Sequence, residues 1–213
     1  MAKKEELTIE EKLQAALIPK EEQPYEIPDS WVWVRLGSIC YKITDGTHKT
    51  PIYTDAGIPF ISVKDIYDNE IHFDNTKFIS DKEHTELFKR CNPEKGDILV
   101  TKSGTIGRTA VVKTEKEFSL FVSVALIKNI KRVISSDYLS YDIKDYIGKI
   151  NVNSDIKGAV IKNYHISDIQ KQPIPLSPIK EQQRIVKKLD SLFEKTKKAK
   201  ELIQEVKEEV EMR

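Results

Sequence analysis

The chain has 213 residues, which is enough for one medium-sized domain with an extension or for two small domains. Hydrophobic residues make up 39% and charged residues 32% of it, a balance that fits a globular core with a long solvated element and excludes a disordered chain. The formal net charge is +1, so any nucleic-acid binding has to rest on local clusters of charge.

The cysteines and the N-terminal residues indicate the cellular compartment in which the protein is expected. Cys40 and Cys91 are far apart and lack paired spacing, which argues against a disulfide framework or a zinc site and favours a reducing environment. Residues 1–17 are densely charged and lack the apolar stretch of a signal peptide. The longest apolar run, residues 120–127, contains Ser123 and is far shorter than the roughly 20 residues that cross a bilayer. We therefore expect a cytoplasmic protein with no membrane contact.

The first region, residues 1–24, predicts a short helix followed by a linker. Thr8 and Glu11 have the spacing of a capping box, in which each side chain bonds the backbone N–H of the other residue. Pro19 is expected to end the helix, and residues 21–24 are typical of a linker. The apolar face of this helix consists of Ile9, Leu13, Ala16 and Leu17.

The second region, residues 25–176, predicts a mixed, mainly β domain. Segments 98–101 and 105–112 are expected to be two strands joined by a tight turn at residues 102–104. One helix is expected from Ser136 to Ile147, with Gly148 as its stop. Its inward-facing residues are Leu139, Ile143, Tyr146 and Ile147. The other predicted strands cover residues 31–36, 58–63, 71–73 and 120–130.

The third region, residues 177–213, predicts one long helix. Ser177 suits the N-cap, Pro178 the first helical position and Glu181 the positive end of the helix dipole. Apolar or small residues then recur at gaps of alternately four and three residues, which is the heptad pattern of a coiled-coil seam. This predicted seam consists of Ile185, Leu189, Leu192, Thr196, Ala199, Ile203, Val206 and Val210.

Two arrangements of this helix satisfy the pattern, namely packing on its own domain or pairing with a partner helix, and the sustained regularity favours the partner. Residues 180–200 contain eight basic and three acidic residues, a net charge of +5, whereas residues 201–213 contain two basic and five acidic residues, a net charge of −3. An antiparallel partner of the same sequence would place opposite charges together, so we expect an antiparallel homodimer. The expected fold class is α+β, a mixed, mainly β domain followed by a long C-terminal coiled-coil helix.

Motifs for catalysis are missing from the sequence. It contains no Walker loop, no dinucleotide fingerprint and no methyl-donor loop. Residues 142–144 and 155–157 each hold an Asp-Ile-Lys fragment of a nuclease cluster, but no Pro-Asp pair lies shortly upstream, so we interpret both as surface charge. The histidines lack metal-ligand spacing and are expected in loops or on the surface; they are His48, His72, His84 and His165. We therefore expect no catalytic activity, metal or cofactor in this chain.

Residues 44–51 and 101–109 are distinctive polar stretches. Each combines glycine with hydroxyl and basic side chains, so the backbone can approach a phosphate while hydroxyls, amides, Lys102 and Arg108 bind it. Arginine is also the side chain that recognises guanine bidentately in the major groove. The alternative is that both are ordinary hairpin loops in which the glycines serve only turn geometry.

A series of short motifs runs through residues 7–213. The first are Ile27-Pro28-Asp29-Ser30-Trp31, Arg35-Leu36-Gly37, Asp45-Gly46-Thr47-His48, Gly57-Ile58-Pro59-Phe60 and Val63-Lys64-Asp65. The central ones are Gly96-Asp97-Ile98-Leu99-Val100-Thr101 and Gly104-Thr105-Ile106-Gly107, and the last is Pro-Ile-Pro-Leu-Ser-Pro-Ile-Lys-Glu-Gln at residues 173–182. This ordered set resembles a target-recognition domain and the helix that follows it in specificity subunits of Type I restriction–modification systems.

The resemblance implies a domain that reads one half of a split double-stranded DNA site, and a helix that pairs antiparallel with a second helix and sets the distance between half-sites. It also implies two kinds of partner, namely methyltransferase subunits, which carry the methyl donor, and a restriction subunit. From the polar loops and the resemblance together, the expected DNA-binding residues are Thr47, His48, Lys49, Lys64, Lys102, Ser103, Thr105 and Arg108.

The chain also departs from the family pattern. Ser177-Pro178-Ile179 stands where Pro-Pro-Leu is usual, and a glutamine common near residues 121–123 is absent, so its role is not carried over. Each motif occurs once, whereas a complete member has two recognition domains, so we expect a natural half-subunit or a fragment whose second half replaces the homodimer partner. The competing hypotheses are a stand-alone enzyme such as a methyltransferase, and an adaptor whose coiled coil is its whole function.

Overall fold

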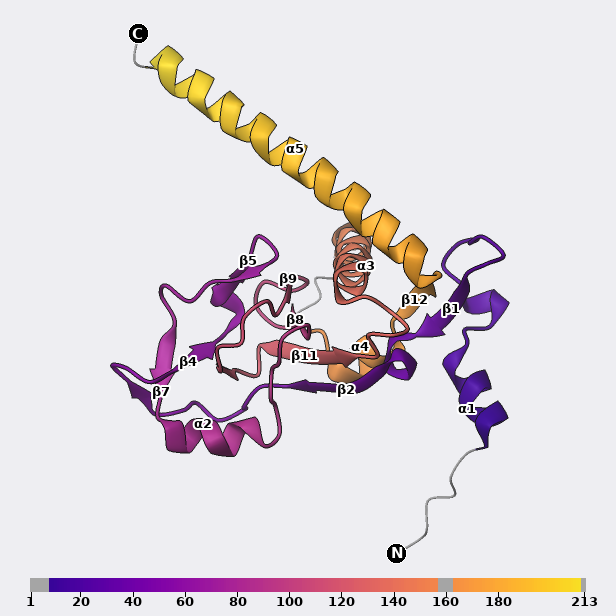
Figure 1. The fold of residues 1–213 in the computed structure, drawn as a ribbon, viewed down its shortest axis with the longest axis horizontal. Coiled ribbons are helices and arrows are strands. Elements are labelled where there is room, and N and C mark those ends of the chain that lie inside the picture. The colour runs from indigo at the N-terminus through magenta and orange to yellow at the C-terminus, as the bar shows by residue number, and fades with distance from the viewer. Residues whose placement is uncertain (1–7, 157–162, 212–213) are drawn as a thin grey trace, which may run out of the picture.

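The computed structural model of the protein describes residues 8–156 and 163–211 (Figure 1). Within these residues the chain forms two four-stranded sheets, two two-stranded sheets and five α-helices. The sheets and short helices form one body, and the long C-terminal helix α5 (Ile179–Glu211) runs away from it (Figure 1). This architecture confirms the predicted α+β fold class with its long C-terminal helix.

The central sheet is antiparallel throughout and has the strand order β2-β11-β8-β9. Because successive residues of a strand point to opposite faces, Ile98 and Ile127 pack in a first core while Leu99 and Leu126 pack in a second core across the sheet. Burial on both faces explains why β8 is an unbroken apolar run. The strands are β2 (Cys40–Asp45), β11 (Val124–Asn129), β8 (Ile98–Thr101) and β9 (Thr109–Val111).

The second four-stranded sheet has the order β10-β4-β7-β3, with β10 and β4 parallel and the other pairs antiparallel. Ser80 caps the following helix α2 (Asp81–Phe88) by accepting the Glu83 N–H at 3.2 Å. A hairpin of β5 (Ile66–Tyr67) and β6 (Glu70–Ile71) turns at Asp68 and Asn69, which both have positive φ. The strands of the sheet are β10 (Ser119–Leu120), β4 (Ile58–Ile61), β7 (Lys77–Ile79) and β3 (Tyr53–Thr54).

The start and the end of the domain meet in a two-stranded antiparallel sheet of β1 (Val32–Arg35) and β12 (Pro173–Leu176). Before it, α1 (Ile9–Ala16) begins with the predicted capping box, because the Thr8 N–H donates to Glu11 Oε2 at 2.8 Å and the Glu11 N–H donates to Thr8 Oγ1 at 3.2 Å. The remaining short helices are the 3₁₀ helices η1 (Lys20–Glu22), η2 (Leu36–Ile39) and η3 (Val63–Asp65), and α4 (Ile166–Lys171).

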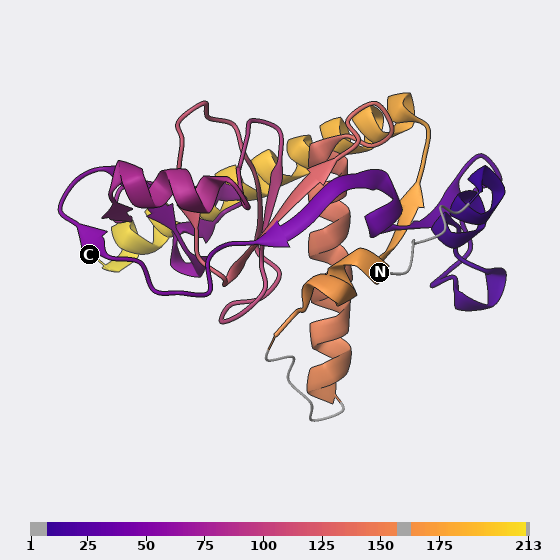
Figure 2. The same cartoon turned by 90° about the horizontal axis from the view of Figure 1, so that it is seen from below.

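The helices α3 (Ser136–Ile156) and α5 cross near the N-terminal part of α5 (Figures 1 and 2). Ile185 and Val186 of α5 pack against the first core, and the Phe193 ring lies 5.5 Å from the Tyr141 ring of α3, centroid to centroid. From residue 191 to residue 208 every side chain is exposed. The α5 helix is therefore anchored to the domain only over its first four turns or so.

The start of α5 differs from the prediction. The Ser177 side chain is buried and its Oγ has no hydrogen-bond partner among residues 8–156 and 163–211, so it does not act as the N-cap. Instead the buried Gln182 amide donates to Ser177 O at 2.7 Å and to Val133 O at 3.1 Å, and its Oε1 accepts the Ser135 N–H at 2.8 Å. Gln182 thus fastens the first turn of α5 to the segment that precedes α3.

Three other predictions are corrected by the structure. The predicted helix at residue 136 continues through Gly148 to Ile156, because a glycine costs a helix only about 1 kcal/mol and Ile147 packs in the first core beside it. The predicted strand 120–130 is two strands, β10 and β11, separated by residues 121–123. His84 is buried in α2 rather than exposed.

The prediction for the strand pair at β8 and β9 is partly confirmed. The two strands pair antiparallel as expected, but the connection is a seven-residue loop, residues 102–108, rather than a tight turn. Sequence reasoning also missed β2, since residues 40–43 were assigned to no element and residues 44 and 45 were taken as the start of a polar loop. None of the helices within residues 8–156 and 163–211 is long and apolar enough to cross a membrane.

Candidate DNA interface

Loops at one end of the central sheet meet in a single surface. Because neighbouring strands are antiparallel, the C-terminal ends of β2 and β8 lie beside the N-terminal ends of β11 and β9. The β4–β10 pair ends there too, since the Phe121 N–H donates to Ile61 O at 2.9 Å and Lys102 N–H donates to Ser123 O at 2.8 Å. We call this surface the loop platform; it consists of residues 46–50, 62–65, 102–108 and 121–123.

Asp45, at the end of β2, is the centre of an ion-pair network under the platform. Its carboxylate lies 3.2 Å from the Lys102 Nζ, 3.3 Å from the Arg90 Nη1 and 3.4 Å from the His48 Nε2. The Asp45 side chain is 9% exposed and that of Lys102 is 12% exposed, whereas His48 is largely in solvent. A buried carboxylate surrounded by cations fixes the position of two platform loops.

The backbone after Asp45 packs directly on the segment after β10. A Cβ on Gly46 would lie 2.0 Å from the Leu120 carbonyl oxygen, so a side chain cannot be accommodated there. The Thr47 N–H donates to Leu120 O and the Val122 N–H donates to Thr47 O, each at 2.9 Å. Gly46 therefore serves the close approach of two backbone segments, and Thr47 is held in place by that approach.

The loop of residues 102–108 is held by its own hydrogen bonds. The Thr101 hydroxyl donates to Thr105 O at 2.6 Å and accepts the Arg108 N–H at 2.9 Å. Gly107 has φ +89, and a Cβ there would lie 2.6 Å from Ile147 Cγ2 of α3. These contacts hold the Thr105 backbone in one place while its side chain faces solvent.

The Lys64 and Arg108 side chains donate to backbone carbonyls. Lys64 Nζ lies 3.3 Å from Asn75 O, and Arg108 Nη1 lies 3.2 Å from Ile66 O of the β5–β6 hairpin. The Lys64 backbone belongs to η3, whose start is a capping box between Ser62 and Asp65. Both cations retain unused N–H donors, because an ammonium has three and a guanidinium has five.

The predicted DNA-binding residues thus fall into two groups that the platform joins. Thr47, His48, Lys49 and Lys102 lie around Asp45. The others lie on the loop after β8 or on η3; they are Ser103, Thr105, Arg108 and Lys64. His48, Lys49 and Thr105 are exposed, whereas Lys102 is engaged beneath the surface.

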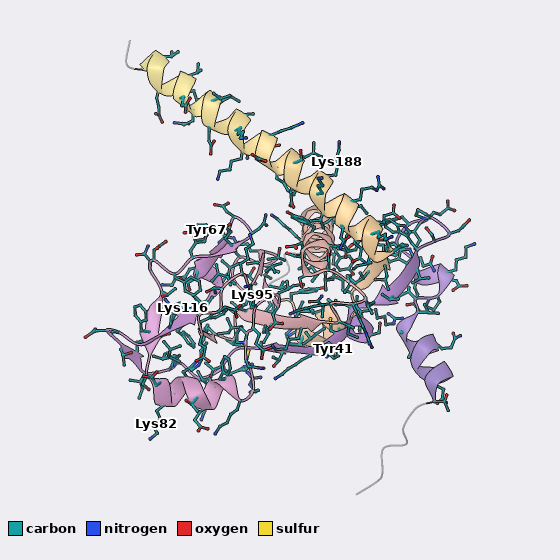
Figure 3. All side chains as sticks on the ribbon, viewed as in Figure 1. Tyr41, Tyr67, Lys82, Lys95, Lys116 and Lys188 are labelled. Carbon is teal, nitrogen blue, oxygen red and sulfur yellow. The ribbon has the colours of Figure 1, made fainter. Side chains whose placement is uncertain are left out.

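Sequence reasoning missed two residues next to the loop platform, Arg90 and Tyr67. Arg90, just after α2, donates to Asp45 O at 2.8 Å and also to Gly46 O, and nothing in its local sequence marks it. Tyr67, on the β5–β6 hairpin, is exposed and its ring stacks on His72 with the centroids 3.4 Å apart (Figure 3). The Asp-Asn turn next to Tyr67 is the one signal that could have indicated this hairpin.

One arrangement in the domain looks like a catalytic set. His84 Nδ1 lies 2.9 Å from Ser119 Oγ, and His84 Nε2 lies 3.3 Å from Glu117 Oε2. Ser119 is fully buried inside the sheet, so a substrate cannot reach its hydroxyl. The buried His84–Ser119 hydrogen bond joins α2 to β10, and Glu117 contacts the histidine from the surface, where its side chain is exposed.

The other groups that could act chemically are inert or scattered. Burial raises the pKa of the Cys40 thiol to about 12 and that of the Cys91 thiol to about 11, so neither is a thiolate at neutral pH. Within residues 8–156 and 163–211 no three histidine, cysteine, aspartate or glutamate side chains are grouped to hold a metal ion. The loop platform presents hydrogen-bond donors and positively charged side chains, which are groups that bind a partner.

An α+β domain with a donor-rich platform and a long projecting helix can be compared with known proteins. The model of the Type I restriction modification DNA specificity domain matches residues 28–208. The EcoAI specificity subunit of a Type I restriction enzyme from Escherichia coli is 29% identical over 204 residues, which cover 90% of this chain and 33% of the relative. The EcoBI specificity subunit, also from Escherichia coli, is 31% identical over 137 residues, 64% of this chain and 29% of the relative.

Solved structures share the fold. The HsdS subunit from Thermoanaerobacter tengcongensis superposes with a TM-score of 0.60 at 21% identity, over 86% of this chain and 41% of that one. A chain from a structure of complex assembly and conformational transition of the type I R-M system gives a TM-score of 0.59 at 22% identity, over 81% of this chain and 40% of that one.

The family match settles the class of protein. Because the matched residues make up most of the chain, the protein belongs to the family of the Type I restriction modification DNA specificity domain. This confirms the resemblance found in the sequence. The chain spans about a third of the length of the Escherichia coli specificity subunits that it matches.

Proposed function

We propose that this chain is the DNA-reading specificity module of a Type I restriction–modification complex and has no catalytic activity of its own. The loop platform reads one half of a split double-stranded DNA site, and α5 brings a second reader to the other half. Catalysis belongs to the partners, which are the methyltransferase subunits that carry the methyl donor and the restriction subunit. The complex acts in the cytoplasm.

The proposal rests on one observation: exposed hydrogen-bond donors lie together on loops whose backbone is held in place by ion pairs and hydrogen bonds. His48, Lys49 and Thr105 present an imidazole, an ammonium and a hydroxyl from loops that the Asp45 network and the Thr101 hydrogen bonds hold in place. Such groups position a protein on phosphates, and Arg108 at the edge of the platform is the type of side chain that reads a guanine. A preorganised surface loses little conformational entropy when it binds.

Within the interface we assign Lys102 a supporting role. Its ammonium is bound to Asp45 beneath the surface, so it stabilises the loops that carry Thr47, His48 and Lys49. Ser103 and Lys64 complete the rim on the other side, where Ser103 is partly exposed and Lys64 is exposed. The sites of direct contact are therefore proposed to be Thr47, His48, Lys49, Lys64, Ser103, Thr105 and Arg108.

We further propose that two copies pair antiparallel through α5, or that α5 pairs with the second half of a longer subunit. Support comes from the seam, because Leu192, Ile203 and Val210 are 47%, 57% and 68% exposed along the part of α5 that projects beyond its own domain. The 33 residues of α5 extend about 50 Å at 1.5 Å per residue. Half-sites one helical turn of DNA apart lie about 34–36 Å from each other, so the helix is long enough to act as the spacer.

The test is to map methylated adenines in cells that carry this chain together with its methyltransferase subunits. We expect methylation only when the chain is present, at a split palindrome, because two identical readers related by a two-fold axis read the same half-site twice. Methylation of the same sites without the chain would contradict the proposal. Methyl transfer by the purified chain alone would instead identify an enzyme, and unchanged methylation after all seven contact residues are replaced by alanine would identify an adaptor.

A further inference from the structure

A groove of about 480 Å³ lies between α3, α5 and the segment before β1. Tyr25 and Phe193, two of its walls, are 51% and 49% exposed although both are large and apolar over most of their surface. The other main lining residues are Trp31, Tyr138, Tyr141, Asp142, Ile185 and Leu189. An aromatic groove that stays open to solvent is typical of a surface that another chain covers.

Asp142 places an unsatisfied carboxylate in this groove. Its Oδ2 is buried and has no hydrogen-bond partner within residues 8–156 and 163–211. The pKa of Asp142 is raised to about 7, first by burial and second by the nearby Asp145 carboxylate, while Lys149 and Gln172 act in the opposite direction. Lys149 is already paired with Asp145 at 2.6 Å. The prediction that residues 142–144 carry only surface charge is therefore wrong for Asp142, whereas Lys144 is exposed as expected. Lys157 of the second fragment lies outside the described residues.

The groove is continuous with the predicted seam, because Ile185 and Leu189 line both. An antiparallel pair of α5 helices forms all eight seam layers only when Ile185 faces Val210 of the other copy and Leu189 faces Val206 of the other copy. In that register the C-terminal part of the second helix passes beside Ile185, over the groove. The last turns of the second helix therefore lie against the exposed aromatic side chains of the groove.

The same register fixes which polar residue of the second helix enters the groove. Position 207 flanks the seam next to Val206, and in an antiparallel pair it faces the equivalent flanking position of the first helix, Val186. Val186 and Phe193 lie on the side of α5 that faces the domain, since Val186 packs on the first core and the Phe193 ring lies 5.5 Å from the Tyr141 ring, centroid to centroid. Lys207 of the second copy is thus directed toward α3, where Asp142 lies.

We propose that the groove is the docking site for the C-terminal part of a second copy of α5, with the Lys207 ammonium of that copy bound to the Asp142 carboxylate. The surrounding rings of Tyr25, Trp31 and Tyr141 favour a cation at the same place. Between residues 201 and 211 Lys207 is the only basic residue, so it is the one cation that this part of the second helix can bring to Asp142. By two-fold symmetry the ion pair forms twice in each dimer. The inference rests on the proposed antiparallel homodimer and adds a specific contact to it.

Disulfide trapping tests the placement. The variant Asp142→Cys with Lys207→Cys should yield a covalent dimer on a non-reducing gel, because the two positions are far apart within one chain and adjacent between chains. The matched control is Asp142→Cys with Gln204→Cys, since position 204 lies on the side of the helix away from the seam. Equal trapping in both variants, or no trapping in either, would overturn the placement.

A double-mutant cycle tests the ion pair with milder changes. Lys207→Gln should weaken dimerisation about tenfold in the otherwise native chain and less than about twofold in the Asp142→Asn background, measured by sedimentation equilibrium. Lys198→Gln, which removes an exposed lysine that pairs with Glu194 on its own helix, should change the dimerisation constant little in either background. Additive effects of Lys207→Gln and Asp142→Asn would overturn the ion pair.

The homodimer itself is checked in the same experiments. Leu192→Cys with Ile203→Cys reports the antiparallel seam without involving the groove, because these residues face each other in the proposed register. If this variant forms a covalent dimer but Asp142 and Lys207 show neither trapping nor coupling, only the groove inference fails. If the native chain is monomeric, the homodimer and the groove inference fail together.

Discussion

The loop platform and the projecting half of α5 differ in how their polar and apolar groups are used. At the platform, backbone and side-chain groups bind one another within the domain, as the four-residue contact of Asp45 with Lys102, Arg90 and His48 shows. Along residues 191–208 every side chain faces solvent, including the apolar Leu192 and Ile203. The difference is that the loop platform is held together by contacts within one chain, whereas the projecting half of α5 leaves apolar side chains uncovered, as the proposed pairing with a second helix requires.

The difference has an energetic consequence, because burial of apolar side chains stabilises a structure. Full burial of a large apolar seam residue stabilises the structure by about 1.5–3 kcal/mol, and the exposed part of a helix without a partner lacks this stabilisation. A platform that is already held by its own domain needs no partner to keep its shape. Changes in α5 should therefore affect assembly while leaving the domain folded, and changes under the platform should affect the domain itself.

The largest effect is expected from charge in the seam. Leu189→Asp together with Ile203→Asp would bury unpaired carboxylates, so dimerisation should weaken at least about a hundredfold and leave monomers. Sedimentation velocity measures this, and Gln204→Asp is the control because position 204 faces away from the seam. A double variant that still dimerises like the native chain would show that these residues do not form the interface.

The next effect concerns the base of the platform. Asp45→Ala leaves the largely buried Lys102 ammonium without its partner, so the free energy of unfolding in urea should fall by about 3 kcal/mol. Glu86→Ala removes a fully exposed ion pair with Lys89 and should cost less than about 1 kcal/mol. Equal losses in the two variants would mean that the Asp45 network does not support the domain.

A pH effect is expected at Asp142. Its pKa in the folded chain is about 7 against an ordinary 3.8, so between these values the folded state holds a proton that the unfolded state has lost. In a chain that carries Ile203→Asp alone, chosen to weaken dimerisation without changing the groove, the free energy of unfolding should therefore fall by about 2–3 kcal/mol as the pH rises from about 4 to about 7, once partial solvent contact is allowed for. Adding Asp142→Asn should remove this part of the pH dependence, and a curve that it leaves unchanged would contradict the burial of the charge.

Arg108 should affect DNA affinity more than domain stability. Arg108→Ala is expected to weaken DNA binding by the assembled complex by about 1–3 kcal/mol, measured by fluorescence anisotropy. Relaxed sequence preference at one position would indicate a base contact, and a reduced salt dependence would indicate a phosphate contact. Unchanged affinity and salt dependence would remove this residue from the interface.

The smallest effect is expected at Lys49. Lys49→Ala should lower the slope of log affinity against log salt by about 1 without changing sequence preference, because an exposed ammonium neutralises one phosphate. Lys95 is an exposed lysine before β8, and the N-terminal end of β8 lies at the opposite end of the central sheet from the loop platform, so Lys95→Ala should leave the slope unchanged. Equal slopes in both variants would place Lys49 outside the DNA path.

Local signals in the sequence predicted much of the fold. The Thr8–Glu11 capping box, the apolar run at β8 and the long helix after Pro178 all appear where propensity and patterning placed them. The errors arose where tertiary packing overrides such signals. Gly148 does not end α3, because Ile147 is buried beside it, and Ser177 does not cap α5, because the Gln182 side chain takes over the first turn.

The candidate site was predicted only in part for the same reason. The polar loops around residues 44–51 and 101–109 were visible in the sequence, and the structure brings both to one end of the central sheet. The partners that fix them come from distant segments, such as Arg90 after α2 and the Leu120 carbonyl after β10. Such contacts depend on sheet order, which no local pattern in the chain reveals.

Light scattering of the native chain at tens of micromolar is the most direct test of the central claim, that the domain is complete while α5 needs a second copy. The account predicts a mass twice that of the 24.5 kDa chain, and a single 24.5 kDa species for the Leu189→Asp, Ile203→Asp variant with its domain still folded. A native chain that stays at 24.5 kDa under these conditions would contradict it, because the exposed seam would then have no second copy to cover it.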